Sequence, residues 1–255
     1  MSTAIPQSEW IRRFRPTPNA RHTLMCFPHG GGAAGAYRTL AAALAPDIET
    51  VAVQYPGRQD RIAEPFVTDI TTLADHAVCG LPGSFNRPLA IFGHSMGATV
   101  AFEAARMLTE RRRPPVALFV SGRPAPDFVE TQTLHLDSDA AILDEMRRLG
   151  GPESETIDML VENPALAEMV LPYVRADYQA VETYRLQPGA ELTCPIVALL
   201  STEDPTTTEE QMRAWAAHTS GPFQLHTFGG GHFYLESHLP KIAGVIKDQL
   251  ESSVP

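Results

Sequence analysis

Short apolar runs alternate with longer amphipathic stretches in the first half of the chain. The apolar runs are five or six residues long, rich in Val, Ile, Leu and Phe, and occupy residues 23–27, 49–54, 88–92 and 116–120. Runs of this length and composition are typical of strands buried on both faces. The stretches between them carry apolar residues at helical spacing and occupy residues 36–44, 68–79 and 96–110. This alternation predicts a mainly parallel sheet with helices on both faces.

The pattern changes after Val120 and returns near residue 195. From about 126 to 187 the chain shows only helical patterns, at residues 139–149, 154–161 and 164–186. Strand-like runs then resume at 195–200 and 223–228, each followed by a helical pattern, at 209–218 and 239–250. The sequence therefore predicts one α/β domain over residues 1–255 with a helical insertion at about 126–187. An insertion after a parallel strand lies over the edge where such sheets bind ligands, so we expect it to form a lid.

Composition limits the classes of protein that the chain can belong to. It is 44% hydrophobic and 20% charged, which suffices for a full core, and its formal net charge of −10 argues against a nucleic-acid partner. The first residues lack the apolar segment of a signal peptide, and no apolar run approaches a membrane span. The three cysteines, Cys26, Cys79 and Cys194, lack metal-binding spacing. We expect a cytoplasmic protein with buried, reduced thiols that bind no metal.

One motif gives the fold class a chemistry. Gly93-His94-Ser95-Met96-Gly97 directly follows the predicted strand 88–92 and opens the predicted helix 96–110. A serine on such a tight strand-to-helix turn is the nucleophile elbow of the α/β-hydrolase fold, which we therefore predict. The plain alternative is a serine that only caps a helix. The context favours Ser95 as a nucleophile.

A serine nucleophile needs a base and an acid that orients the base. In this fold the chain order is Ser, then Asp or Glu, then His. His232 follows the glycine run 229–231 after the strand near the C-terminus, and is the predicted base. Asp204 follows the strand at 195–200 and is the predicted acid, with Glu203 as the competitor. Pro205 favours Asp204, because it fixes the turn there.

The oxyanion that forms during attack needs two backbone donors. One is the amide of the residue after the nucleophile, Met96, and the other lies in the loop after the first predicted strand, where we choose Gly30. Two other polar residues could approach the cleft. His94 is expected to support the site rather than to act as base. Asp177 can reach a cleft from helix 164–186, but it lies in the wrong part of the topology for the acid.

Several motifs together resemble one known family. They cover nearly the whole chain and are Cys26-Phe-Pro-His-Gly-Gly-Gly, Gln54-Tyr-Pro-Gly-Arg-Gln-Asp-Arg, Gly93-His-Ser-Met-Gly, Ser121-Gly-Arg-Pro-Ala-Pro, Leu171-Pro-Tyr-Val-Arg-Ala-Asp-Tyr, Glu182-Thr-Tyr and Gly230-Gly-His-Phe. With them the chain resembles the stand-alone type II thioesterases that serve polyketide synthases and non-ribosomal peptide synthetases. The Pro-Gly-Arg and Arg-Ala-Asp-Tyr elements are the most discriminating, since generic esterases have no reason to carry them.

The resemblance implies an activity and assigns roles. Ser95, Asp204 and His232 would form the triad, and the insertion would be a mobile lid over an acyl chamber. The implied reaction hydrolyses acyl thioesters on the phosphopantetheine arm of a carrier protein and so clears wrong or stalled acyl groups, without a cofactor. The chain departs from the family in two places. The family often has a glycine-aspartate pair before the acid, where this chain has Ser201-Thr202-Glu203-Asp204, and it commonly has alanine at the position of Gly30.

The implied partner raises a question of charge. Carrier proteins of this type are usually acidic, as this chain is, so a local basic patch would be needed to steer them. Arginine clusters at residues 12–15, 111–113 and 147–148 are candidates, although each is also what a solvated surface looks like. Arg58 and Arg61 could instead be structural ion-pair partners. We expect a monomer, because the chain shows no heptad repeat or obvious dimer element.

Three other functions are compatible with parts of the pattern. A general carboxylesterase or lipase would use the same triad. A cyclising terminal thioesterase domain is a second alternative. The initial Met and the lack of a preceding carrier domain in the sequence argue against it. An inactive hydrolase fold used as a binding module is the third, and the intact Ser, His and Asp argue against it.

Overall fold

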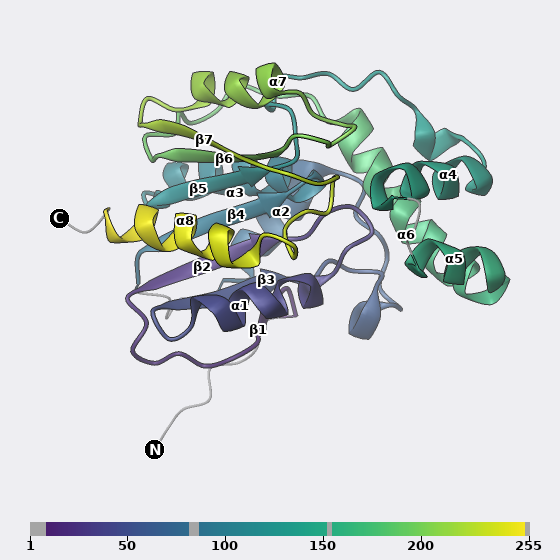
Figure 1. Cartoon of the computed structure of the whole chain (residues 1–255), viewed down its shortest axis with the longest axis horizontal. Coiled ribbons are helices and arrows are strands. Elements are labelled where there is room, and N and C mark those ends of the chain that lie inside the picture. Colours follow the sequence, from purple (N-terminus) through teal and green to yellow (C-terminus); the bar gives the residue numbers. More distant parts are fainter. Residues whose placement is uncertain (1–8, 82–86, 152–154, 253–255) are drawn as a thin grey trace.

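A seven-stranded sheet forms the centre of the computed structural model, which describes residues 9–81, 87–151 and 155–252 (Figure 1). Its strands are β1 (Ile11–Arg13), β2 (His22–Phe27), β3 (Ile48–Val53), β4 (Leu89–His94), β5 (Ala117–Ser121), β6 (Ile196–Ser201) and β7 (Phe223–Phe228). They lie in the order β1-β3-β2-β4-β5-β6-β7, with β1 antiparallel to β3 and all other pairs parallel. The predicted parallel α/β architecture is confirmed.

Helices cover both faces of this sheet. They are α1 (Arg38–Leu44), α2 (Ile70–Cys79), α3 (Met96–Glu110), α7 (Glu209–Arg213) and α8 (Leu239–Glu251). Apolar residues of α1 and α8 share one core cluster with one face of the strands, and those of α2 and α3 share a second cluster with the other face. In Figure 1, α1 and α8 lie in front of the strands and α2 and α3 lie behind them. Burial on both faces explains the near-continuous apolar runs of the central strands.

Three helices lie between β5 and β6 in the chain. They are α4 (Asp139–Gly150), α5 (Glu155–Glu162) and α6 (Pro164–Thr183). Figure 1 shows them grouped beside one end of the sheet, away from the layers that α1, α2, α3 and α8 form. They have a small apolar cluster of their own, built on Ile142, Leu171 and Val174. The insertion therefore has its own packing centre, and whether it moves as a lid stays a prediction.

Some element boundaries differ from the sequence-based expectations. The short edge strand β1 was not predicted, because its Ile-Arg-Arg sequence lacks an apolar run. The pattern at 209–218 forms α7 and then a separate 3-10 helix, Ala214–His218. The helix predicted from 164 to 186 ends at Thr183, and the predicted start of another at Ser154 lies outside the described residues.

The expectation of three buried thiols is wrong for one cysteine. Cys26 and Cys194 are buried, whereas Cys79 is exposed. Cys79 is the last residue of α2, which buries Leu73 and Ala77 against the core, and its Sγ lies 3.6 Å from Nη1 of Arg111. Within the described parts of the chain, no helix has the length and apolarity that a bilayer crossing requires.

Candidate active site

The turn between β4 and α3 holds Ser95 in an unusual backbone conformation. Its φ is 54° and its ψ is −126°, a region that non-glycine residues rarely adopt, and its amide donates to the carbonyl of Ser121 over 2.8 Å. The flanking glycines permit this turn. A Cβ on Gly97 would lie 2.1 Å from the carbonyl oxygen of Phe27, and one on Gly93 would lie 2.1 Å from that of Gly97. The predicted elbow is thus present as a strained, glycine-dependent turn.

The loops after β6 and β7 bring His232 and Asp204 together. Nδ1 of His232 lies 2.8 Å from Oδ2 of Asp204, and the two side chains are 2% and 0% exposed. The other carboxylate oxygen of Asp204 accepts hydrogen bonds from the amide and hydroxyl of Thr206, at 2.8 and 2.6 Å. Glu203 is exposed, so the geometry favours Asp204 over its competitor. With Nδ1 held by the carboxylate, Nε2 of His232 is left to act as a base.

The surroundings of Asp204 keep it ionised. Burial raises the pKa of its carboxyl, but the hydrogen bonds from His232 and Thr206 outweigh burial and hold that pKa below its usual value. A buried carboxylate beside the imidazole stabilises the imidazolium that forms when His232 accepts a proton. The His232–Asp204 pair therefore has the arrangement of a base and its orienting acid.

A pocket of about 700 Å³ lies at the carboxyl edge of the sheet. Ser95, Met96, Gly30 and His232 all line it, so four of the five predicted site residues share one cavity. Its apolar wall comes largely from the insertion and includes Met146, Leu149, Ile157, Val174 and Val181. Asp204 sits behind His232. The arrangement places Ser95, His232 and an apolar wall in one pocket.

The loop after β2 supplies the second predicted backbone donor. It turns sharply, because the amide of Gly32 donates to the carbonyl of His29 over 2.9 Å and Gly31 has a φ of 75°. Among the described residues, none accepts a hydrogen bond from the amide of Gly30, which lines the pocket. The other predicted donor, Met96, is the first residue of α3, where backbone amides lack partners within the helix. Both amides are available to a ligand.

Two further histidines pack around His232. The rings of His94 and His232 lie 4.9 Å apart, and Nδ1 of His94 lies 2.9 Å from Oγ of Ser121, which in turn lies 2.7 Å from the hydroxyl of Tyr234. Burial, with His232 and His29 nearby, holds the pKa of His94 well below its usual value. Burial, with His232 and Arg58 nearby, lowers the pKa of His29 to about 4. Both rings are therefore neutral near pH 7 and add no positive charge beside His232.

A buried ion pair beside this site joins Arg58 to a partner, Asp177, that the sequence did not predict. Arg58 and Asp177 are joined by hydrogen bonds of 2.7 and 2.8 Å, and their side chains are 4% and 2% exposed. Each belongs to one of the two discriminating motifs, which was the available signal. Arg61 is also buried and pairs with Glu64. Burial excludes Arg58 and Arg61 as surface docking residues and leaves the structural role.

The surface arginines proposed for steering are largely engaged in ion pairs. Each of the following cations lies within 4 Å of a carboxylate: Arg12 with Asp60, Arg13 with Glu49, Arg111 with Asp75, Arg147 with Asp158, and Arg148 with Glu145. Such pairs reduce the local positive potential available to an acidic partner. The position of a carrier-docking patch stays a prediction.

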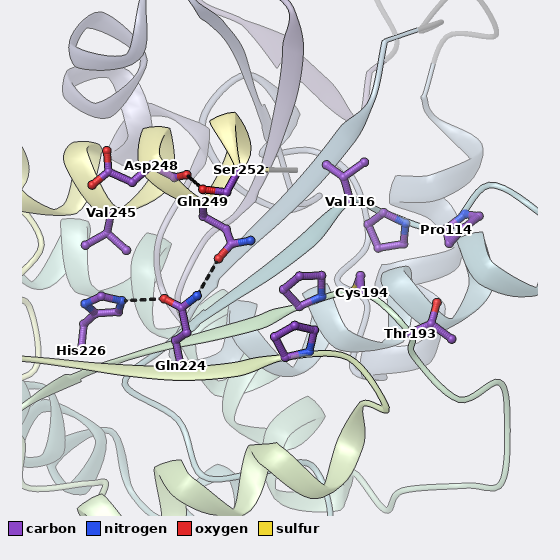
Figure 2. A pocket seen from close by; sticks show the side chains of 13 residues that line it. Pro114, Val116, Thr193, Cys194, Gln224, His226, Val245, Asp248, Gln249 and Ser252 are labelled. Atoms are coloured by element: carbon purple, nitrogen blue, oxygen red, sulfur yellow. Dashed lines mark hydrogen bonds between the residues drawn. The ribbon is translucent and has the colours of Figure 1, made fainter. Parts of the chain in front are cut away.

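A second pocket, of about 710 Å³, lies near the amino ends of β5, β6 and β7. Figure 2 shows Gln224 between His226 and Gln249, with hydrogen bonds of 3.4 Å to the ring and 3.0 Å to the amide. Prolines and Cys194 line much of the rest. The histidine here contacts an amide, so the pocket lacks the paired base and acid of the first.

Comparison with known proteins places the chain in a family. Residues 22–250 match the model of the thioesterase domain family. The chain belongs to the thioesterase family. Thioesterase PikA5 of Streptomyces venezuelae is 44% identical to it over 243 residues, which are 94% of this chain and 85% of that protein. The probable cadicidin biosynthesis thioesterase of Streptomyces griseus is 41% identical over 92% of this chain, which spans 64% of that longer protein.

A solved structure agrees with this assignment. The type II thioesterase BorB from the borrelidin biosynthetic cluster is 47% identical and superposes with a TM-score of 0.86 over 94% of this chain and 97% of that one. The resemblance to type II thioesterases and the thioester-hydrolase activity are therefore confirmed. The individual roles of Ser95, Asp204, His232, Gly30 and Met96 in this thioesterase stay predictions that its geometry supports.

Proposed function

We propose that this thioesterase hydrolyses acyl thioesters on the phosphopantetheine arm of carrier proteins. It would thereby remove aberrant or stalled acyl groups from a polyketide or non-ribosomal peptide synthase. The observation that carries the proposal is the hydrogen-bonded His232–Asp204 pair at the wall of a pocket that also contains Ser95. The thioesterase PikA5, the probable cadicidin biosynthesis thioesterase and the type II thioesterase BorB of the borrelidin biosynthetic cluster support the substrate class.

The residues would perform the reaction in two steps. Oγ of Ser95 attacks the thioester carbonyl while Nε2 of His232 takes the hydroxyl proton, and Asp204 stabilises the imidazolium. The amides of Gly30 and Met96 bind the oxyanion. The tetrahedral intermediate collapses, the C–S bond breaks, and His232 returns the proton to the thiolate of the arm.

Water completes the cycle by attacking the acyl-serine ester. His232 takes a proton from the water, a second oxyanion forms against the same amides, and the proton returns to Oγ of Ser95 as the free acid leaves. His29 and His94 remain neutral throughout, so the imidazolium of His232 is the one positive ring in the cluster.

The insertion would bind the acyl chain and act as a mobile lid. Met146, Leu149 and Ile157 come from α4 and α5, and Val174 comes from α6, so the apolar wall of the pocket depends on where these helices lie. A lid that closes over a bound acyl group would exclude stray water from the site. We further propose that the enzyme is a cytoplasmic monomer that uses neither nucleic acid nor cofactor.

The test compares the same acyl groups attached to three different leaving groups. Matched acyl chains are presented as thioesters on a carrier protein, as thioesters of free pantetheine and as p-nitrophenyl esters. The wild type and Ser95→Ala are assayed on each, and kcat/KM is measured. We expect the carrier-bound thioesters to be hydrolysed fastest and the alanine variant to lose that activity. Faster hydrolysis of the free esters, with no gain from the carrier, would contradict the proposal and favour a general carboxylesterase.

A further inference from the structure

The two most discriminating motifs of the sequence meet inside the molecule. Arg58 of the Pro-Gly-Arg element follows β3, and Asp177 of the Arg-Ala-Asp-Tyr element lies on α6. Nη1 and Nη2 of Arg58 donate to the two carboxylate oxygens of Asp177 at 2.7 and 2.8 Å, a two-pronged geometry that fixes both side chains. The rings of Tyr55 and Tyr173 lie 5.3 and 4.8 Å from the guanidinium carbon. The pair joins the insertion to the sheet domain.

The same two side chains also hold the loop that carries Gly30. Oδ2 of Asp177 accepts a hydrogen bond of 2.7 Å from the amide of Gly31, and Nη1 of Arg58 donates one of 2.9 Å to the carbonyl of Gly32. These bonds orient the peptide group between Gly30 and Gly31 and the one between Gly32 and Ala33. Gly31 has a φ of 75°, and a Cβ there would lie 3.3 Å from Val174 of α6. The loop is thus packed closely against the insertion helix.

The orientation of the Gly30 amide follows from a hydrogen bond between Gly32 and His29. The amide of Gly32 donates to the carbonyl of His29, and that carbonyl shares its peptide group with the Gly30 N–H. In a planar trans peptide the C=O and N–H point in opposite directions, so fixing the carbonyl fixes the amide. Arg58 and Asp177 hold Gly31 and Gly32, and through them the direction of the Gly30 N–H.

Stability alone is a weak reason for such a pair. Two buried charges lose their hydration, and well-packed apolar residues often stabilise a fold as well or better. Here the two charged groups additionally satisfy one amide and one carbonyl of a strained glycine loop that lines the pocket. Apolar residues of the same size could not make these hydrogen bonds.

We propose that Arg58 and Asp177 are a positioning pair that sets the Gly30 oxyanion donor and ties it to α6. The donor is then in place only while α6 is docked, which couples the insertion to the chemistry. This inference rests on the proposed oxyanion role of Gly30, and it adds residues that do not touch the reacting atoms themselves.

The test removes the pair and compares it with a second buried pair. Asp177→Asn, Arg58→Gln and the double variant are compared with Glu103→Gln, because Glu103 and Arg106 are similarly buried, at 7% and 8% exposure, and lie outside the pocket. For each variant we measure kcat and KM on acyl-pantetheine, the rate at which a fluorophosphonate labels Ser95, and the melting temperature. Labelling also develops charge at the oxyanion site, and it does not depend on the natural substrate.

We expect Asp177→Asn to lower kcat and the labelling rate by about 10²-fold each, with KM changed less than about threefold, as for loss of one oxyanion donor. The double variant should lose no more than the worse single variant, because the two residues act as a unit. Glu103→Gln should lower the melting temperature while kcat and labelling per folded molecule stay within about twofold of the wild type. If Asp177→Asn behaves like Glu103→Gln, the positioning role is wrong.

A gentler variant covers the case in which Asp177→Asn does not fold. Arg58→Lys keeps the charge but cannot donate the paired hydrogen bonds to both oxygens of Asp177. We expect about a tenfold loss of kcat and of the labelling rate at nearly unchanged KM. Unchanged values in folded Arg58→Lys would overturn the proposal. If the wild type does not hydrolyse carrier-bound thioesters, but Asp177→Asn still slows labelling of Ser95, only the proposed substrate is contradicted. Carrier hydrolysis that is indifferent to Asp177 would contradict only the positioning pair.

Discussion

The two pockets of this molecule differ in chemistry far more than in size. The carboxyl-edge pocket and the amino-edge pocket have volumes of about 700 and 710 Å³ and lie at opposite ends of the same parallel strands. The first receives the N-terminus of α3, Ser95 and His232, whereas the second is lined by prolines, by Gln224 and Gln249, and by the C-terminal end of α8. Cavity volume is thus no guide to function here. Strand direction is the better guide, because helix N-termini and ligand-binding loops lie at the carboxyl edge of a parallel sheet.

Removing one oxygen atom from the carboxyl-edge pocket tests the comparison most severely. Ser95→Ala leaves the cavity nearly unchanged in shape, and we expect kcat for acyl-pantetheine hydrolysis to fall by about 10⁶-fold, the loss typical of an absent serine nucleophile. Fluorophosphonate labelling should disappear with it, and the melting temperature should serve as the control for folding. Residual activity within about 100-fold of the wild type would mean that another group performs the attack.

The acid is tested by two neighbouring carboxylates. Asp204→Asn should lower kcat by about 10⁴-fold, because the amide no longer holds His232 in the tautomer that leaves Nε2 free. Glu203→Gln is the matched control, since Glu203 is exposed and precedes Asp204 directly, and it should stay within about twofold of the wild type. The reverse ranking of the two variants would transfer the role to Glu203.

Acid should destabilise the protein through the histidines of the carboxyl-edge pocket. The pKa of His29 is lowered to about 4 by burial, His232 and Arg58, so below its unfolded value of 6.5 the unfolded chain takes up a proton that the fold resists. The contribution of His29 to stability is therefore complete above about pH 6.5, falls between pH 6.5 and 4, and changes no further below pH 4. We expect His29→Asn to remove about 2 kcal/mol of that loss, measured by urea unfolding at pH 7 and pH 4.5.

The matched variant for this measurement is His226→Asn in the amino-edge pocket. His226 contacts the amide of Gln224 rather than a buried cluster of histidines. A wild-type loss of stability that is unchanged in His29→Asn would show that His29 does not carry the acid sensitivity.

The smallest effect is expected at the amino-edge pocket. Gln224→Ala with Gln249→Ala removes the hydrogen-bonded amides shown in Figure 2, and kcat/KM should stay within about twofold of the wild type. The measurement uses the same acyl-pantetheine assay as the Ser95 variant. A loss of tenfold or more, without a change in melting temperature, would show that the two edges of the sheet are coupled.

Local sequence patterns predicted the sheet and much of the site. The central strands are buried on both faces, so their apolar runs stand out, and the elbow is marked by its Gly-His-Ser-Met-Gly sequence between a strand and a helix. Asp204 and His232 could be predicted as acid and base because each follows a strand whose end lies at the carboxyl edge; their roles stay predictions. In each case a few adjacent residues are enough to indicate the feature.

Features that depend on distant contacts were not predictable in this way. Arg58 and Asp177 are 119 positions apart, and neither motif alone shows that the other side chain lies across from it. The edge strand β1 gains its bonds from β3 rather than from an apolar sequence of its own. Cys79 is exposed because it is the last residue of α2 and lies off the buried face of that helix. The apolar residues next to it in the sequence suggested burial instead.

The position of the insertion between β5 and β6 has a consequence for how such an enzyme can change over evolution. The elbow is complete before residue 126, the predicted acid and base come after residue 195, and much of the apolar wall of the pocket lies between them. Substitutions, or even exchange of the whole segment, can therefore reshape which substrates fit while the reactive groups are inherited intact. The tie between Asp177 and the glycine loop would set the limit, since a transplanted segment must bring that one aspartate to the same place.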